Sequence, residues 1–150
     1  RAADLGKGKW RDRFIAALRL CLEVLGPYRS TLSALRPILL GDRDEGLFAA
    51  STAFSRVRVQ AIFFNAVSAA SDSPEPKLAE SLGRLLYMLH LSVILWWLFD
   101  RSPGQRATAA LVTLLDRMLP SFALAMRLPQ MKNFVRSADV LVNEALFDDA

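Results

Sequence analysis

The sequence predicts an all-α fold, and two observations support the prediction. Leu and Ala dominate the 150 residues while β-branched residues are sparse, and apolar residues recur at intervals of three and four. That spacing places apolar side chains on one face of a helix, whereas a half-buried strand alternates every second residue. A chain of this length builds one core. We therefore expect residues 1–150 to form a single domain of about six helices.

The first helix is predicted from about Lys9 to Leu25 because it has one apolar stripe, and Gly26-Pro27 ends it. Arg13 lies mostly off that stripe. The stripe comprises Trp10, Phe14, Ala17, Leu18, Cys21, Leu22 and Leu25. A second helix begins at about Tyr28 and is interrupted at Pro37, since proline lacks the backbone donor and disfavours helix in the residue before it.

A third helix is predicted from about Leu47 or Thr52 to Ala70, after the polar turn Gly41 to Gly46. Its apolar residues at helical spacing are Phe54, Val57, Ala61, Phe64 and Val67. Ser71 to Pro76 is the clearest loop in the chain. The fourth and longest helix follows it, from about Pro76 to Phe99.

The fourth helix raises the question of a membrane span. Its uninterrupted apolar part, Leu85 to Phe99, is 15 residues long and contains His90 and Ser92. A span needs roughly 18 to 20 residues, so we interpret the segment as a core helix and expect no membrane partner. The segment Ser102 to Gln105 then places a Ser N-cap, a Pro at the first helical position and a Gln at the third, which is the spacing of a capping box.

A fifth helix is predicted from Pro103 to about Met126, with a kink at Pro120. A last amphipathic helix follows from about Met131 to Phe147, with Asp139 largely away from its apolar side. That side comprises Phe134, Val135, Ala138, Leu141, Val142 and Leu146.

Composition limits the class of protein. Apolar residues make up 53% of the chain and the mean hydropathy is +0.24, so either the core is large or part of the apolar surface meets a partner or a ligand. The net charge is +4, but the basic residues are scattered apart from Lys7, Lys9, Arg11 and Arg13, which is typical of a solvated surface. Cys21 is the single cysteine, so no internal disulfide can form and we expect a cytoplasmic protein.

No motif for catalysis or metal binding stands out. The sequence has no glycine-rich phosphate loop, no cluster of Cys or His with metal spacing and no G-x-S-x-G turn. His90 does not complete a triad, because Ser92 is on a different helix face and Asp100 is about 15 Å further along. We expect no enzyme, no catalytic residue, no metal and no cofactor.

Aromatic residues with a few polar tips predict a pocket for a small hydrophobic ligand. Core packing is the more common role for each residue alone, and a lone His on an apolar helix is more often a hydrogen-bonded core residue. Together, however, they supply the usual wall of a binding cavity. The residues expected to contact the ligand are Phe14, Cys21, Phe54, Asn65, Tyr87, His90 and Trp97.

The stretch from Trp96 to Pro129 resembles the C-terminal domain of TetR-family transcriptional regulators. One group of these regulators has a helix that ends in W-x-x-x-D-R-S-P-x-Q before the dimerisation helices. The residues that match this pattern are Asp100, Arg101, Ser102, Pro103 and Gln105. The order of elements agrees over essentially the whole chain: a first helix led by basic residues, a kinked second helix, a long central helix and two final amphipathic helices.

The resemblance implies a ligand-binding and dimerisation domain. DNA would be contacted only through a helix-turn-helix domain upstream of Arg1, which we expect because the chain does not begin with Met. A ligand held by the first, third and fourth helices, and oriented by His90, Asn65 and Tyr87, would change the spacing of two DNA-binding heads in a homodimer. The last two helices would form a four-helix bundle with the same two helices of the partner chain. The expected interface residues are Leu111, Leu114, Met118, Phe134, Ala138 and Leu141.

Two other functions fit parts of the sequence. A carrier of lipid or quinone on the same scaffold, like the TetR-like proteins that assist quinone biosynthesis, would suit a large apolar pocket and Trp96-Trp97. A peripheral membrane protein with its last helix on the bilayer is disfavoured, because that end of the chain carries too few basic residues relative to Asp139, Glu144, Asp148 and Asp149.

Overall fold

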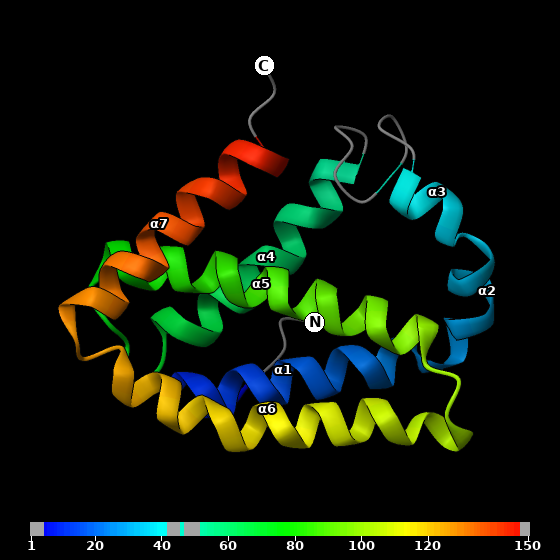
Figure 1. The fold of residues 1–150 in the computed structure, drawn as a ribbon, viewed down its shortest axis with the longest axis horizontal. Coiled ribbons are helices and arrows are strands. Elements are labelled where there is room, and N and C mark those ends of the chain that lie inside the picture. The colour runs from blue at the N-terminus through cyan, green and yellow to red at the C-terminus, as the bar shows by residue number, and fades with distance from the viewer. Residues whose placement is uncertain (1–4, 42–45, 47–51, 148–150) are drawn as a thin grey trace.

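The computed structural model of the chain describes residues 5–41, 46 and 52–147, and every regular element in those residues is helical (Figure 1). The elements are α1 (Trp10–Leu25), η1 (Gly26–Tyr28), α2 (Arg29–Ala34), α3 (Arg36–Gly41), α4 (Ala53–Ser68), α5 (Pro76–Phe99), η3 (Pro103–Gln105), α6 (Arg106–Ala125) and α7 (Pro129–Leu146). The prediction of an all-α fold is confirmed.

The helix boundaries follow the local signals, with one shift. The break in the second helix falls at Leu35, two residues before Pro37, so that the proline sits in the first turn of α3. A missing backbone donor is harmless there, because the first amides of a helix have no partner within the helix. Of the two starts considered for α4, Leu47 lies outside the described residues, and the helix begins directly after Thr52.

The central helix is α5, which packs against α4 and α7, while α1 packs against α4 and α6 (Figure 1). The largest fully buried side chains come from α1, α4, α5 and α7. They include Phe14, Leu18, Phe63, Val67, Leu82, Val93 and Val135. The core is therefore continuous from α1 through α4 to the middle of α5, where the candidate site lies.

The stripe predicted for α4 is not the face that this helix buries. Phe63, Ala66 and Val67 are buried, whereas Phe54 is 73% exposed and Phe64 is 44% exposed. Apolar residues occur on all sides of this helix, so the helical period does not select one face.

A close approach of α4 and α5 depends on Gly83. A Cβ atom at this position would lie 3.0 Å from the Cα atom of Phe64. Contacts that short between a Cβ and another carbon are repulsive, so the glycine lets the two backbones touch.

Arg13 is buried, contrary to its predicted place off the apolar stripe. Its Nε donates to the carbonyl of Ala66 at 3.0 Å, and its Nη2 donates to the carbonyl and to the Oδ1 of Asn65 at 3.1 and 3.0 Å. The guanidinium thus bonds two carbonyls in the last turn of α4, of which that of Asn65 also accepts from the amide of Ala69. The packing of α1 on α4 therefore includes a buried polar joint.

Asp139 is also buried, and the expectation that it lies away from the packed side of the last helix is wrong. Arg84 donates to its two carboxylate oxygens from Nε at 2.7 Å and from Nη2 at 2.6 Å, and the hydroxyl of Ser81 donates at 2.9 Å. This bidentate ion pair holds α7 against α5.

The last two helices diverge from the turn that joins them, because α6 packs on α1 while α7 packs on α5 (Figure 1). By length and composition alone, α5 and the segment Pro103–Ala125 are apolar enough to cross a membrane. In the most apolar 18-residue stretch of α5, 44% is buried inside the chain, whereas in that of Pro103–Ala125 only 17% is buried. The core explains the apolar character of α5, whereas much of the apolar surface of α6 is open in the single chain.

Candidate functional site

Three aromatic rings meet where α4 crosses α5. Tyr87 and His90 are three residues apart, so they share a face of α5 and both reach Phe63. The ring centroids of His90 and Phe63 are 4.6 Å apart, and those of Tyr87 and Phe63 are 6.2 Å apart. The ring centroid of Phe14 lies 5.9 Å from that of Phe63. This stack fixes the orientation of the imidazole ring.

His90 has two buried nitrogens, Nδ1 and Nε2, and neither has a hydrogen-bond partner in the described part of the chain. Burial lowers the pKa of this residue to about 4, so the imidazole is neutral at pH 7 and offers one donor and one acceptor. A buried polar group without a partner costs about 1 to 3 kcal/mol. Nearly all such groups in folded proteins are paired, so His90 calls for a partner that the chain does not supply.

A cavity of about 290 Å³ adjoins His90 and Tyr87. It lies between α2, α3, α4 and α5, and its wall is almost wholly apolar. The aliphatic side chains in this wall include Leu32, Leu39, Val59, Leu91, Ile94 and Leu95. A partly open apolar cavity beside one unpaired polar side chain has the composition of a pocket for a small hydrophobic molecule.

Two basic residues, Arg36 and Arg56, also line the cavity, and in the described part of the chain no acidic side chain does. Arg36 is held by its own surroundings: Nε donates to the carbonyl of Ser33 at 2.9 Å, and the guanidinium lies 4.7 Å from the ring centroid of Phe99. The phenol of Tyr87 has its pKa raised by burial, against a smaller opposing effect of the positive charge of Arg56. The polar side chains that line the cavity are thus an imidazole, a neutral phenol, two cations and the hydroxyls of Thr52 and Ser55.

Of the seven predicted ligand contacts, only Tyr87 and His90 line this cavity. Phe14 is sealed in the core against Phe63, and Trp97 is buried beside a separate shallow groove formed with α1 and α6. The other predicted contacts lie elsewhere. Cys21 is half-buried, and burial raises the pKa of its thiol.

Asn65 and Phe54 are on exposed parts of α4. Asn65 is a partner of Arg13, as described above, and Phe54 lies 5.3 Å below the guanidinium of Arg58. The residues missing from the prediction are aliphatic ones of α4 and α5, such as Val59 and Leu91, and those of the short helices α2 and α3. The sequence signal of α2 and α3 was weak, because two helices of six residues each show no period long enough to identify a buried face.

The motif that suggested the family resemblance forms the turn between α5 and α6. The carboxylate of Asp100 accepts from the amide and hydroxyl of Ser102 at 2.8 and 2.6 Å, and from the amide and hydroxyl of Thr108 at 2.8 and 2.6 Å. These bonds hold the pKa of this carboxyl well below its usual range. Arg29 adds a tie to α2 by donating to the carbonyl of Trp97 at 3.0 Å and to that of Asp100 at 2.6 Å.

The predicted capping box does not form in this turn. Ser102 makes no side-chain bond as the cap of η3, and its hydroxyl instead accepts from the amide of Ala107 at 2.9 Å. Gln105 has a left-handed backbone with φ of 53°, so it is not the third residue of a regular helix. The hydroxyl of Ser102 and the carboxylate of Asp100 together cap the first turn of α6, through the amides of Ala107 and Thr108.

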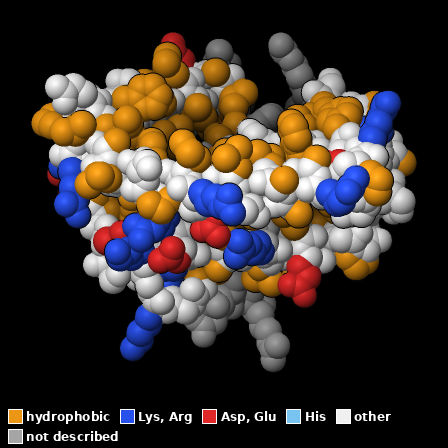
Figure 2. All heavy atoms as spheres, turned by 60° about the horizontal axis from the view of Figure 1, so that its bottom comes forward, with side chains coloured by type: hydrophobic (Ala, Val, Ile, Leu, Met, Phe, Trp, Pro, Cys, Tyr) orange, Lys and Arg blue, Asp and Glu red, His pale blue; other side chains and the backbone are white. Residues whose placement is uncertain are grey.

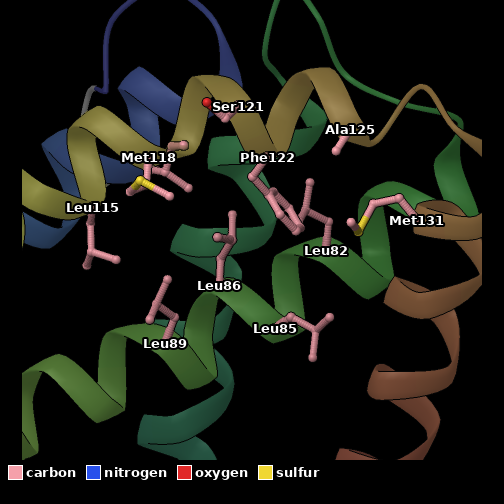
Figure 3. Close-up of a pocket in the computed structure, with 11 residues that line it drawn as sticks. Leu82, Leu85, Leu86, Leu89, Leu115, Met118, Ser121, Phe122, Ala125 and Met131 are labelled. Carbon is pink, nitrogen blue, oxygen red and sulfur yellow. The ribbon is translucent and has the colours of Figure 1, made fainter.

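A second apolar groove, of about 470 Å³, lies between α5, α6 and α7. Figure 3 shows Leu86 and Leu89 of α5 directed toward α6, with Met118 and Phe122 opposite them and Met131 at the α7 end. Its lining is almost free of polar atoms. This groove is open on the side where α6 and α7 diverge.

The residues predicted for a dimer interface lie on α6 and α7, and one of them, Met118, lines that groove. Leu114, Met118, Phe134 and Leu141 are 56 to 64% exposed, and Leu111 and Ala138 are half-buried. In Figure 2, apolar side chains gather across the upper part of the face that carries α6. Monomeric proteins rarely expose so many large apolar side chains together.

Within the described residues, no group of three or more His, Cys, Asp or Glu side chains could hold a metal ion. Comparison with models of known protein families gives no match, and comparison with curated proteins gives none either.

Proposed function

We propose that this chain is the ligand-sensing and homodimerisation domain of a TetR-like transcriptional regulator, and that its effector is a small hydrophobic molecule. The observation that supports this most directly is an apolar cavity lined by His90, a residue whose two buried ring nitrogens have no partner in the described part of the chain. A ligand with a hydroxyl or carbonyl group would give the imidazole its missing partner while its apolar body fills the space between α3 and α5.

The mechanism couples ligand binding to the arrangement of the helices around the cavity. The cavity lies between α4, α5 and the short helices α2 and α3, and α4 in turn packs on α1. A ligand that binds better to one arrangement of these helices shifts the population toward it by its differential affinity. DNA contacts would come from a domain upstream of Arg1, connected through α1.

A pair of probes tests the cavity. Naphthol and naphthalene have the same apolar body, but only naphthol can hydrogen-bond to His90. We expect the chain to bind naphthol about tenfold more tightly, as followed by ligand fluorescence, because one buried hydrogen bond contributes roughly 1 kcal/mol or more. His90→Phe should abolish the preference and His90→Gln should retain part of it. Equal affinities for both probes in the unmodified chain would refute the role of His90.

The exposed faces of α6 and α7 support the homodimer. We expect the chain to sediment as a dimer, and Met118→Lys with Phe134→Lys to yield monomers with unchanged helix content, since both side chains are already exposed in the single chain. Thr113→Lys, at another exposed position of α6, is the matched control. Dimers that survive the double substitution would place the interface elsewhere.

The second candidate is a TetR-like accessory protein that binds a lipid or quinone without DNA, and the almost purely aliphatic wall of the cavity favours it. The sequence of the parent gene upstream of Arg1 separates the two. A helix-turn-helix segment there supports the regulator. A natural start close to Arg1 would refute the regulator and leave the accessory protein.

A further inference from the structure

A groove of about 590 Å³ lies at the end of the molecule where α6 stops and α7 begins, far along α5 from the cavity at His90. Figure 1 shows that α1, α5 and α7 all begin at this end. Four basic side chains line the groove: Lys9, Arg11, Arg127 and Lys132. Residues that are scattered in the sequence therefore converge in space.

The positive charge of this groove is not neutralised by the chain. Lys9, Arg127 and Lys132 have no ion pair among the described residues, and Arg11 has only a 3.6 Å contact with Asp12. The one acidic residue in the described lining is Asp72, whose carboxylate accepts from the amide of Trp10 at 2.8 Å.

Helix ends add to the positive potential. Both α1 and α7 start here, so the positive ends of two helix dipoles lie at this groove, although the first amide of α1, that of Trp10, is bonded to Asp72 and α7 begins at Pro129, which has no amide hydrogen. The C-terminal end of α6 contributes the opposite sign, and one cation, Arg127, follows it directly. Three further cations are left to face the groove.

The remaining wall is apolar. Trp10 is buried at the base, and Leu78, Pro120 and Leu124 form the sides, with Leu124 63% exposed. Like charges gathered in a hollow repel one another, and a multivalent anion relieves that repulsion. Apolar walls beside them suit an anion carried on an organic body.

We propose that this groove binds the phosphate group of an organic phosphate. The phosphate oxygens accept from Arg127, Lys132 and Lys9, and the apolar part of the ligand lies on Pro120 and Leu124. The site is separate from the cavity at His90, so the chain would have two ligands of different chemistry. A soluble phosphate compound and the headgroup of a lipid share this chemistry.

Calorimetric titration with two probes distinguishes the sources. The first probe is inorganic triphosphate, and the second is a soluble short-chain phosphatidic acid, with the phosphatidylcholine of the same chain length as its control. The variant is Arg127→Gln with Lys132→Gln, and the matched control is Arg101→Gln with Arg117→Gln, which removes the same charge from exposed positions outside the groove.

We expect at least one phosphate probe to bind, with a Kd that rises about tenfold or more in the groove variant and is unchanged in the control variant and in His90→Phe. Triphosphate binding indicates a soluble phosphate compound, and binding of phosphatidic acid alone indicates a lipid headgroup. The proposal is overturned if neither probe binds, or if the control variant weakens binding as much as the groove variant. Binding of duplex DNA without either probe overturns it as well.

Discussion

The joint between α5 and α7 permits a sharp test, because one arginine holds two acidic residues in different surroundings. Arg84 bonds Asp139, which is 3% exposed, at 2.7 and 2.6 Å, and it bonds Glu80, whose side chain is 56% exposed, at 3.0 Å. Asp139→Asn and Glu80→Gln each remove one negative charge from the same partner and keep the shape of the side chain.

The two substitutions should differ in magnitude. Breaking a buried ion pair typically costs 3–5 kcal/mol, and the guanidinium of Arg84 is 32% exposed, so water compensates it in part. We therefore expect Asp139→Asn to lower the free energy of unfolding by about 3 kcal/mol. Glu80→Gln should cost about 0.5 kcal/mol or less, because exposed pairs contribute little.

Urea unfolding followed by circular dichroism at one fixed protein concentration measures both values, since a dimer makes stability depend on concentration. The larger loss corresponds to a fall in Tm of about 6 to 12 °C for a chain of this size. Replacing the pair together, Arg84→Met with Asp139→Leu, should restore most of the loss. Equal losses for Asp139→Asn and Glu80→Gln would refute the view that burial makes this pair hold α7.

Three further predictions follow from single positions. Burial lowers the pKa of His90 from 6.5 to about 4, so between these pH values the unfolded chain binds more protons than the folded chain. As the pH is lowered through this window, the free energy of unfolding should therefore decrease by up to about 3 kcal/mol more in the native chain than in His90→Phe. Equal decreases in urea melts would contradict this. Gly83→Ala should destabilise the chain by about 1 to 3 kcal/mol, because the new Cβ atom would lie 3.0 Å from the Cα of Phe64. Gly26→Ala should be neutral or stabilising, because no atom lies within 4 Å of a Cβ at that position. A higher Tm for Gly83→Ala would count against the close approach of α4 and α5. Asp100→Asn should speed hydrogen exchange in the first turn of α6 and leave α1 unchanged, and unchanged protection in α6 would show that this carboxylate does not anchor the turn.

Helix boundaries could be predicted where the chain carries its own stop signals. The bounds of α5 agree with the prediction at both ends, because Pro76 starts the helix and the polar segment after Phe99 ends it. The buried face of α4 could not be predicted in the same way. Phe63 and Phe64 are adjacent and equally apolar, and only the packing of α5 near Gly83 decides which of them is buried.

The burial of charged residues is a second feature that could not be predicted from the sequence. Arg13 and Asp139 were predicted to lie largely off the apolar stripes of their helices, but both are buried against partners, Asn65 and Arg84, that are 52 and 55 residues away along the chain. A helical period shows which residues share a face, but it does not show that a charge will meet its partner across an interface. The candidate site was predictable only as far as Tyr87 and His90, which share one face of one core helix.

These buried polar residues, taken together, are the reason that His90 stands apart. The described part of the chain buries five polar or charged side chains, and four of them have partners within the chain: Arg13, Ser81, Thr108 and Asp139. A sequence that satisfies a buried guanidinium and a buried carboxylate could equally have placed an aliphatic residue at position 90, where the neighbours are Phe63 and the leucines of the cavity wall. The unpaired imidazole lowers stability and contributes nothing to packing that Leu or Phe would not. Its presence beside an apolar cavity is accounted for if the missing partner is a group on a bound molecule, and on that ground the probes that differ only in one hydroxyl are the decisive comparison.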